Sequence, residues 1–585
     1  MRVFFDLMWY FRQERGRYLL GITLLVIVSL LNLLPPHIVG KVVDEIRQGR
    51  LTTRELSYWL LILAVLTLVS YVIRYIWRLA LYGGSTKLSR ILRDRLYEHY
   101  TVLSPQFYHE HRIGDLMAHA TNDIQAIEAT AGDGILTLFD SLTTGILVVG
   151  TMALTINWKL TLVVLIPMPF MAWATSRYGS LLHKRFAKAQ AAFSDINDRV
   201  QENISGVRVV KAFGQEEVEK ESFRVLSQDV VDKNIAVAKV DALFDPTISL
   251  IVGISYFLAV AVGAVYVVHG SLSIGQLTAF TMYLGQLIWP MLAFGWLFNI
   301  VERGSASYNR VQTLLAVRPD IVDASNAVDT PPSGAIYYQI RSFTYQKAST
   351  PALSDIDVLV PRGQTLGIVG KTGSGKTTLL RLLIREFDGA DGDIRFGDRS
   401  LYDYKLEALR SSIGYVPQDH FLFSTTVAGN IAFGRPESTI PEIESAARMA
   451  GIHEDIMQFP EQYNTVVGER GVTLSGGQKQ RISIARALLL DAEVLILDDA
   501  LSAVDARTES HILDALRAER QGRTTLIAAH RLSAVEHADE IIVLKNGDIA
   551  ERGTHAELMT ADGWYVAMYA RQQLESLVEQ GGMPE

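Results

Sequence analysis

The 585-residue sequence contains no cysteine. Disulfide scaffolds, thiolate zinc sites, iron–sulfur clusters and cysteine nucleophiles are therefore excluded. Charged residues are also scarce, at 20%, and the formal net charge is −8. Because nucleic-acid-binding domains normally carry a basic excess, this balance argues against a nucleic-acid partner. At roughly 100–200 residues per domain, the length requires more than one domain.

Hydrophobic residues make up 49% of the chain, and their long runs fall almost entirely before residue 301. Six runs approach the roughly 20 residues that span a bilayer core, which predicts an all-α, six-helix transmembrane domain. The aromatic and basic residues 1–17 are typical of a helix lying in the membrane interface. We place the six runs at about 18–39, 57–80, 134–155, 159–178, 247–269 and 275–300.

The loops between these runs differ in length and charge. Residues 81–133 and 179–246 are long, polar and helical in pattern, whereas the other connections are short. Lys and Arg concentrate in the long loops and near the N-terminus, which predicts that both long loops and both termini are cytoplasmic. We therefore expect a multi-pass protein of the cell membrane (inner or plasma), embedded in a lipid bilayer, with a transmembrane domain over 1–318.

The residue pattern of the sequence changes after residue 318. Residues 319–334 are polar and rich in turn-forming residues, which predicts a linker. From 335 to 585, short β-type runs such as TLGIVG, VLILDD and TTLIAA alternate with helical stretches. This alternation predicts a mostly parallel α/β domain.

Residues 370–377 (GKTGSGKT) fit the phosphate-loop pattern GxxxxGK[ST]. They follow a predicted strand and open a predicted helix, which is the context that the pattern requires. Glycines let the backbone wrap phosphate groups, while Lys376 would reach the β- and γ-phosphates of ATP and Thr377 would bind Mg²⁺. The expected nucleotide-binding residues here are Gly370, Lys371, Thr372, Gly373, Ser374, Gly375, Lys376, Thr377 and Thr378.

A second acidic motif lies about 120 residues further on. Residues 494–499 (VLILDD) are four apolar residues followed by two acids. A buried strand would deliver Asp498 to the Mg²⁺ shell. Many parallel strands end in Asp, so this motif gains its meaning from the phosphate loop that precedes it.

The run Leu474, Ser475, Gly476, Gly477, Gln478 (LSGGQ) carries a resemblance. It is the signature of the ATP-binding cassette (ABC) transporters, and the order of six spans followed by one nucleotide domain resembles one half of a type I (also called type IV) exporter. The resemblance covers nearly the whole chain. It implies an all-α six-helix transmembrane domain followed by an α/β P-loop ABC ATPase domain.

The resemblance also assigns single residues. Tyr345 would stack on adenine, Gln418 (the Q-loop) would contact nucleotide and Mg²⁺, and His530 would be the switch histidine. Gly468–Gly471 resembles the X-loop and Ser502–Asp505 the D-loop. In this family two nucleotide domains close head to tail, and each ATP lies between one chain's phosphate loop and the other chain's LSGGQ. One chain alone therefore cannot complete a site.

The chain departs from the family at Asp499, where the family has a Glu that polarises the attacking water. Aspartate is one methylene shorter, and a carboxylate set back by about 1 Å can cost on the order of 100-fold in rate. Asp499, Gln418 and His530 remain the expected catalytic residues. The resemblance is greatest to the degenerate-site (BmrC-type) subunit of heterodimeric bacterial multidrug exporters.

These features predict a partner half-transporter with a catalytic Glu, and amphipathic drugs or lipid-like molecules as substrates. A homodimeric lipid or peptide exporter with two slow ATP sites is the alternative. The six spans argue against a soluble cassette ATPase.

The membrane half holds three further candidates. Residues 105–116 and 206–216 resemble the family's coupling helices, which dock on nucleotide domains. Asp140, inside the third run, would either meet a cationic substrate or pair with an Arg or a hydroxyl. Aromatic residues of the sixth run would either line a cavity or pack against helices and lipid. The prolines expected to break or bend helices are Pro35, Pro36, Pro167, Pro169, Pro246 and Pro290.

Overall fold

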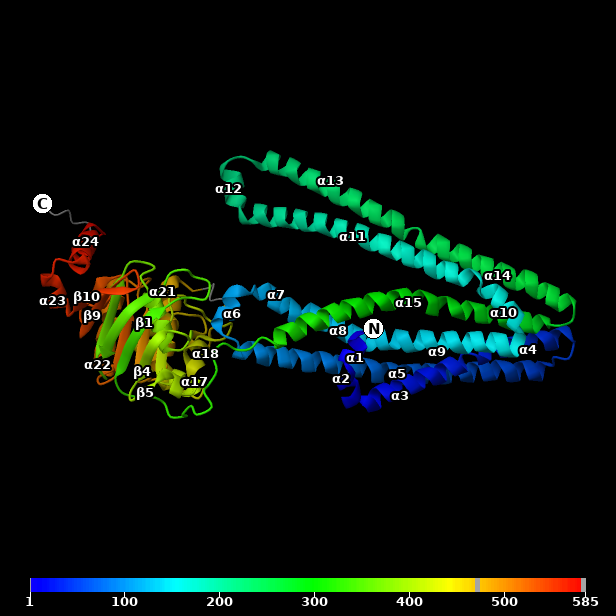
Figure 1. Cartoon of the computed structure of the whole chain (residues 1–585), viewed down its shortest axis with the longest axis horizontal. Helices are drawn as coiled ribbons and strands as arrows, with labels where there is room; N and C mark the ends of the chain where they lie inside the picture. Colours follow the sequence, from blue (N-terminus) through cyan, green and yellow to red (C-terminus); the bar gives the residue numbers. More distant parts are fainter. Residues whose placement is uncertain (1, 469–473, 580–585) are drawn as a thin grey trace. The chain divides into compact units, whose positions relative to one another are not determined.

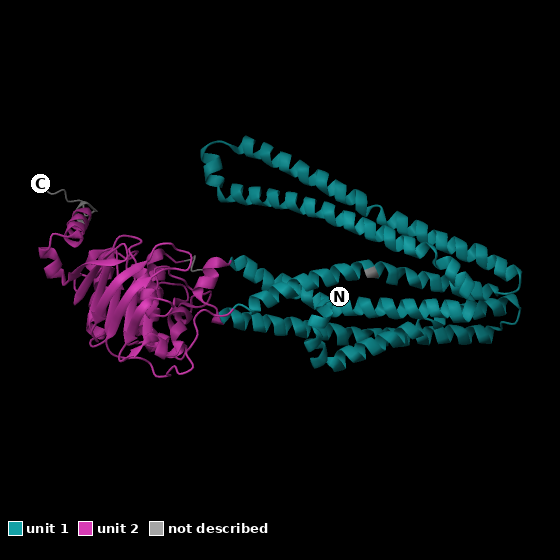
Figure 2. Ribbon diagram, in the orientation of Figure 1, with its two compact units in different colours: residues 1–101, 112–317 teal, residues 102–111, 318–585 magenta. Residues whose placement is uncertain are grey.

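The computed structural model describes residues 2–468 and 474–579. The chain divides into two compact units (Figure 2): unit 1 comprises residues 1–101 and 112–317, and unit 2 comprises residues 102–111 and 318–585. Unit 1 is helical and unit 2 is built on two sheets. The predicted order, a helical membrane domain followed by an α/β domain, is confirmed. Residues 102–111, which the sequence assigns to the membrane half, group with unit 2.

The first part of unit 1 contains two short helices followed by three longer ones (Figure 1). Val3 and Tyr10 of the two short helices, and Leu7 between these helices, are fully buried, so residues 2–17 pack against the rest of the unit through these apolar side chains. The five helices are α1 (Arg2–Asp6), α2 (Met8–Gln13), α3 (Arg15–Leu31), α4 (Leu34–Arg47) and α5 (Thr53–Val102).

The rest of unit 1 is again helical. Three π-helical turns interrupt its first long stretch, at His119–Asp123, Thr130–Gly134 and Met152–Asn157. The α-helices are α7 (Ile113–Ala118), α8 (Ile124–Ala129), α9 (Ile135–Thr151), α10 (Trp158–Leu165), α11 (Pro167–Ser205), α12 (Val207–Ala212), α13 (Glu216–Asp241), α14 (Phe244–Val268) and α15 (Ile274–Leu315).

Among the described residues, five helical stretches are long and apolar enough to cross a membrane: 15–47, 53–102, 113–165, 216–268 and 274–315. The fourth predicted run, 159–178, does not form one element. It is divided between α10 and α11, which meet at Ile166 directly before Pro167. Proline cannot donate the backbone hydrogen bond that a continuous helix needs at that point.

The prolines act in two ways. Pro35 and Pro36 lie in the first turn of α4, and Pro167 begins α11, so these mark helix starts as expected. Pro290 lies inside α15, which continues through it from Ile274 to Leu315. Helix α15 is therefore continuous although Pro290 cannot donate a backbone hydrogen bond, because its packing in unit 1 tolerates this loss.

Unit 2 contains a four-stranded sheet of order β2-β1-β4-β5 and a six-stranded sheet of order β10-β9-β3-β8-β7-β6. The first sheet is antiparallel, whereas β9, β3, β8, β7 and β6 pair in parallel. The strands are β1 (Ile336–Phe343), β2 (Leu353–Val360), β3 (Thr365–Gly370), β4 (Asp391–Phe396), β5 (Arg399–Ser400), β6 (Ile413–Val416), β7 (Val494–Asp498), β8 (Thr524–Ala528), β9 (Glu540–Lys545) and β10 (Asp548–Gly553).

Helices cover these sheets. β7 and β8 are buried along their whole length, as expected for parallel strands with helices on both faces. The helices are α6 (Pro105–Glu110), α16 (Lys376–Leu383), α17 (Leu406–Ser411), α18 (Val427–Ile431), α19 (Ile440–Met449), α20 (His453–Met457), α21 (Gly476–Leu489), α22 (Ala506–Glu519), α23 (His555–Thr560) and α24 (Trp564–Glu579).

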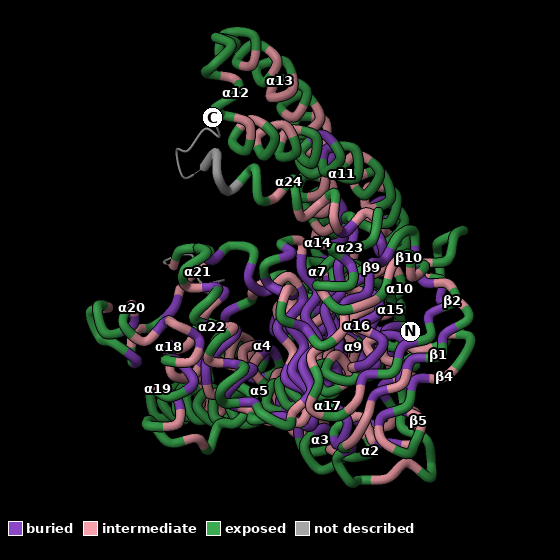
Figure 3. The backbone as a smooth tube through the Cα atoms, turned by 90° about the vertical axis from the view of Figure 1, so that its left-hand side faces the viewer, coloured by how far each residue is buried: buried purple, intermediate pink, exposed green. Residues whose placement is uncertain are grey.

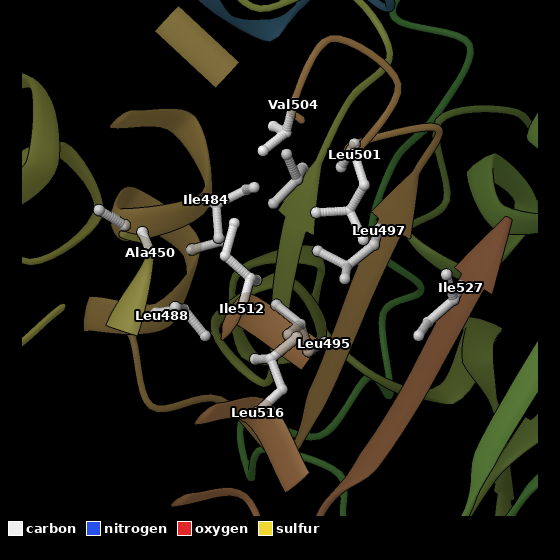
Figure 4. Close-up of a cluster of buried hydrophobic side chains, with 14 of the residues drawn as sticks. Ala450, Ile484, Leu488, Leu495, Leu497, Leu501, Val504, Ile512, Leu516 and Ile527 are labelled. Atoms are coloured by element: carbon white, nitrogen blue, oxygen red, sulfur yellow. The ribbon is translucent and has the colours of Figure 1, made fainter. Parts of the chain in front are cut away.

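The larger core of unit 2 lies between the parallel sheet and its helices. Figure 4 shows Leu495 and Leu497 of β7 pointing toward side chains of α21 and α22, among them Ile484 and Ile512. Side chains on the other face of the same strands join a second core with β1, β2 and α16. The parallel sheet is therefore fixed on both faces, so the loops at its strand ends are held in place.

The predicted linker is not a free segment in the structure. Val328 pairs with Tyr404, and Lys405 forms an ion pair with Asp329 at 2.7 Å. Asp323 accepts a hydrogen bond from the Leu406 backbone at 2.8 Å. Residues 318–334 therefore run over the surface of unit 2.

Candidate functional site

The loop between β3 and α16 forms a tight backbone cradle. Gly370 (φ +149°) lies so close to the Leu544 carbonyl oxygen that a Cβ atom would collide with it. Gly375 (φ +105°) is the N-cap of α16, and a Cβ there would lie 2.8 Å from the Ala352 oxygen. Only glycine fits these two positions, and the loop ends at the amino end of α16, where the N–H groups of the first helical turn favour anions.

Lys376 is folded back into this cradle. Its Nζ donates hydrogen bonds to the carbonyl oxygens of Gly370 (2.8 Å) and Lys371 (3.2 Å), and its side chain is buried. Burial lowers the pKa of the Lys376 ammonium, and the carboxylates of Asp499 and Asp498 partly offset this by favouring the charged form. A buried cation held only by two carbonyls is well placed to bind an anionic phosphate.

Thr377 and Asp498 lie together at the carboxyl end of β7. Thr377 Oγ1 donates to Asp498 Oδ1 at 2.9 Å, and the Tyr415 hydroxyl donates to Oδ2 at 3.3 Å. Burial raises the pKa of Asp498, and these two hydrogen bonds act in the opposite direction.

A hydroxyl and a carboxylate oxygen are ligands that Mg²⁺ prefers, and Mg²⁺ in such sites takes its other ligands from water and phosphate. The described residues contain no cluster of three or more His, Cys, Asp or Glu side chains that could hold a metal. That agrees with a metal bound through one carboxylate, one hydroxyl and a nucleotide. The donor set at Thr377 and Asp498 therefore fits Mg²⁺.

Asp499 follows β7 in a left-handed conformation (φ +50°), which Asp adopts more readily than most residues. Its backbone is held at two atoms. The Asp499 N–H donates to the Ala528 oxygen at 2.8 Å. The Asp499 carbonyl accepts from Gln480 Nε2 (3.3 Å) and Ser502 Oγ (3.0 Å). These hydrogen bonds hold the backbone of residue 499 in place, so it does not shift to make up for the shorter reach of the Asp499 side chain.

The parallel sheet gathers the remaining predicted residues at one edge. The phosphate loop follows β3, His530 follows β8, Asp498 and Asp499 end β7, and Gln418 follows β6. These four strands are neighbours, in the order β3-β8-β7-β6, and they run in parallel. Their carboxyl ends therefore lie side by side, which is where open α/β sheets bind ligands.

His530 is positioned by the C-terminal helix α24. Gln572 donates its side-chain amide to the His530 carbonyl at 2.8 Å and accepts from the Leu532 backbone at 2.9 Å. Gln418 is exposed at the start of the loop after β6. Both follow strands that are direct neighbours of β7.

Tyr345 lies beside the first turn of α16. Its hydroxyl is 2.9 Å from Thr378 Oγ1, and its ring packs edge-on against Phe343 (5.1 Å between centroids) and Phe387 (5.1 Å). The ring is half-buried, so these contacts fix its orientation while one side remains accessible. An aromatic ring held beside the phosphate loop suits stacking on a base.

The LSGGQ segment lies elsewhere in the unit. Ser475 and Gln478 form a capping box at the start of α21, with the Gln478 N–H donating to Ser475 Oγ at 3.3 Å. Leu474 packs against the larger core, while Ser475 and Gly476 are exposed. Within the described part of the chain, no hydrogen bond joins residues 474–478 to residues 370–378. Of the predicted X-loop, residues 469–471 fall outside the described residues.

The predicted D-loop leads directly into α22. Asp505 caps this helix by accepting from the Thr508 N–H at 3.0 Å. Arg531, next to His530, donates to the Val504 carbonyl at 3.0 Å and pairs with Glu509 at 3.2 Å. One arginine thus ties the D-loop to the segment that carries His530.

Sequence reasoning missed Gln480, Tyr415 and Gln572. Gln480 is fully buried, and it joins the Asp499 carbonyl to the Ala503 N–H, which it accepts at 2.9 Å. Its position just after LSGGQ offered a faint signal, since a glutamine in an otherwise apolar helix face needs partners. Nothing in the local sequence marks Tyr415 or Gln572 as contacts of Asp498 and His530.

Two predicted regions of the membrane half meet different surroundings. Within unit 2, α6 lies against the nucleotide domain: Ser104 donates to Asp320 at 2.9 Å, and Lys347 pairs with Glu110 at 2.7 Å. In unit 1, α12 has no buried residue; Val209 within it is 61% exposed, and Phe213 directly after it is 74% exposed. Figure 3 shows α12 and most of α13 as exposed or intermediate.

Within the spanning helices, Arg74 of α5 donates to the Asn32 side chain at 3.2 Å. Tyr283 of α15 is buried, and its hydroxyl donates to the Leu33 carbonyl at 2.6 Å, so it packs between helices. Trp289, Trp296 and Phe298 are each more than half exposed.

Known proteins are similar to this chain over nearly its whole length. The family descriptions "ABC transporter transmembrane region" and "ABC transporter" match residues 18–291 and 353–502. The chain is 51% identical over 579 residues to "Multidrug resistance-like ATP-binding protein MdlA" of Escherichia coli (strain K12), covering 99% of this chain and 98% of that one. It is 46% identical to "Probable multidrug resistance ABC transporter ATP-binding/permease protein YheI" of Bacillus subtilis (strain 168), over 98% of each.

A solved structure is also similar to this chain over nearly its whole length. "Structure of a bacterial Atm1-family ABC exporter with ATP bound" matches with a TM-score of 0.78 and 26% identity, over 96% of this chain and 98% of that chain.

Proposed function

The chain belongs to the ABC transporter family, as an ATP-hydrolysing exporter with a multi-pass transmembrane domain and a cytoplasmic ATPase domain, and from this premise we propose that it is one half of a multidrug exporter. Its substrates are amphipathic drugs or lipid-like molecules, and it resides in the cell membrane with both termini in the cytoplasm. ATP with Mg²⁺ is its energy source.

The observation that carries this proposal is the edge formed by β3, β8, β7 and β6. The support is that these strands are parallel neighbours, so the segments that carry Lys376, Asp498 and His530 follow adjacent strand ends. In our proposal the loop amides and Lys376 bind the ATP phosphates, and Tyr345 stacks on adenine. Thr377, Asp498 and Gln418 hold Mg²⁺, which neutralises charge on the phosphates. Asp499 orients the attacking water, and His530 contacts the terminal phosphate.

Two chains are needed to complete a site in this scheme. Ser475 and Gly476 are exposed at the start of α21 and have no contact with the chain's own phosphate loop among the hydrogen bonds of the described residues. In our proposal Leu474–Gln478 closes over ATP held by a second chain. The exposed apolar residues Val209 of α12 and Phe213 directly after it supply a docking surface for that chain's nucleotide domain.

We propose that the second chain is a different half-transporter, one with Glu at the position of Asp499. The support is chemical: the backbone at Asp499 is held at two atoms, so its carboxylate stays about one methylene short of the attacking water. The chain's own site would then be slow, and its intact LSGGQ would serve the fast site.

The decisive experiment measures ATPase activity and drug transport in proteoliposomes. The chain is purified alone and with a co-expressed half-transporter that carries Glu at the equivalent position. We expect little turnover alone and drug-stimulated turnover in the pair. Vigorous, drug-stimulated ATPase of the chain alone would instead establish a homodimer.

Two variants of the chain distinguish its two roles in the pair. Ser475→Arg places a long side chain where the partner's terminal phosphate docks, so we expect it to abolish most of the turnover. Lys376→Ala weakens only the slow site, so most of the turnover should remain. The opposite pattern would show that the fast site is the one on this chain's phosphate loop.

A further inference from the structure

A second cavity lies at the opposite ends of the same strands. The nucleotide edge is at the carboxyl ends of β3 and β8, whereas this cavity is bordered by Thr365 and Thr525, at their amino ends. It encloses about 320 Å³, within the range of sites for small ligands. The end of α22 and the turn that follows form its wall. Its lining includes Leu513, Leu516 and Ile527, together with Arg517, Arg520 and Arg523.

Arg520 is the unusual member of this lining. It is only 7% exposed, and its Nη2 donates to the Ala492 carbonyl at 2.9 Å. Its Nε atom is buried and has no hydrogen-bond partner. Burial, followed by the charge of Arg523, lowers the pKa of Arg520 to about 10. A buried guanidinium in this state is a charge without adequate compensation.

The neighbouring carboxylates are engaged by other groups. Asp491 forms a bidentate ion pair with Arg523. Glu493 pairs with Arg362 at 2.6 Å, and Asp539 accepts the Thr365 N–H at 2.7 Å. Among the described residues, no carboxylate forms a hydrogen bond or ion pair with Arg520. Asp491 and Glu493 favour the charged form of Arg520 without bonding to it, so its Nε–H is left without an acceptor.

We propose that this cavity is a binding site for a small organic phosphate, separate from the ATP site. Its phosphate group contacts Arg520 at the base and Arg517 at the rim, since guanidinium groups match phosphate oxygens in pairs. Its organic part covers Leu513 and Leu516 on the apolar floor. Arg517 is half exposed, pairs with Asp514 at 2.8 Å and donates to the Leu513 carbonyl at 3.4 Å. Both partners lie on its own helix, so its side chain can turn toward a ligand.

The test uses phenyl phosphate as the probe and full-length protein carrying Lys376→Ala, which suppresses phosphate binding at the phosphate loop. Isothermal titration should give a dissociation constant of about 1 mM or tighter. Inorganic phosphate, which lacks the ring, should bind more weakly. Benzoate, which has the ring but a single carboxylate, separates a requirement for phosphate from one for any aromatic anion.

Three variants in the same background test the residues. Arg520→Gln should weaken phenyl phosphate binding by about tenfold or more, and Arg517→Gln by several-fold. Arg571→Gln, on the exposed face of α24, is the matched control and should bind normally. Because Arg520→Gln could impair folding, thermal unfolding is measured for each variant, and Arg517→Gln alone is sufficient for the test.

Hydrogen exchange locates the binding event. Phenyl phosphate should slow exchange in peptides covering residues 513–525, and not in those covering 370–378. The proposal is overturned if phenyl phosphate does not bind at several millimolar, or if Arg517→Gln binds as tightly as the Arg571→Gln control. Tighter binding of benzoate than of phenyl phosphate would overturn the assignment to phosphates.

Discussion

Replacing Asp499 by Glu should raise ATP hydrolysis at this chain's own site. The added methylene extends the carboxylate by about 1.5 Å while the charge stays the same. The backbone at residue 499 is held by the Ala528 oxygen, Gln480 and Ser502, so the whole gain in reach appears at the carboxylate. A misplacement of about 1 Å costs roughly 100-fold, so we expect an increase of up to about 100-fold, or about 2.7 kcal/mol in the barrier.

The substitution also has a cost that the structure predicts. Asp499 has φ +50°, a conformation in which Asp is enriched and Glu is not. We expect a destabilisation of the nucleotide domain of about 0.5–1 kcal/mol, seen as a small fall in the unfolding temperature. ATP affinity should change little, because Lys376, Thr377 and Asp498 are untouched.

The assay is single-turnover hydrolysis of radiolabelled ATP by the assembled protein, with the catalytic Glu of the partner changed to Gln so that only this site reports. Asp499→Asn, which has the same size and no charge, sets the background rate. Equal and substantial rates for Asp499 and Glu, both well above Asn, would refute the argument from reach. Equal rates for all three would place the defect in the partner's signature.

Three further predictions concern residues within unit 2 and within unit 1. Gly370→Ala forces a Cβ atom against the Leu544 carbonyl in a left-handed conformation, so ATP binding, measured by equilibrium dialysis, should be lost. Gly373→Ala is the control: residue 373 has open space around it, so this variant should retain more ATP binding. Gln480→Leu removes the hydrogen bonds to Asp499 and Ala503, which should cost about 1–3 kcal/mol of stability and lower ATP hydrolysis. Gln480→Glu can still accept from the Ala503 N–H, so it should keep part of the stability that Gln480→Leu loses, as measured by chemical denaturation. Asp123 in unit 1 accepts hydrogen bonds from Ser307 (2.8 Å) and Arg310 (3.0 Å). Asp123→Ala should therefore lower the unfolding temperature of the membrane half without changing ATP affinity. An unchanged unfolding temperature would mean that this buried network contributes nothing to stability.

The fold was predictable where one segment carries the whole signal. Apolar runs of about 20 residues and the alternation of short strands with helices are visible in windows of the sequence. The fourth apolar run was less informative, because composition records hydrophobicity and not the break at Ile166 that divides α10 from α11. Pro290 shows the reverse case, in which a strong local signal for a bend did not end the helix.

The site divides in the same way. The phosphate loop is contiguous, and its glycines and Lys376 act through backbone geometry within eight residues, so the sequence by itself determined that part. It also determined that Asp499 is one methylene shorter than the residue of the family.

Only the tertiary structure decided that Tyr415 would bond Asp498, that Gln480 would hold the backbone of Asp499, and that Gln572 would support His530. The same is true of the buried, uncompensated Arg520. These partners are 19 to 83 residues apart in the chain, and a polar side chain far from its partner has no periodicity or spacing that records the contact. The order of the parallel strands brings Tyr415 of β6 beside Asp498 of β7, while Gln480 and Gln572 come from α21 and α24, which pack against the same core.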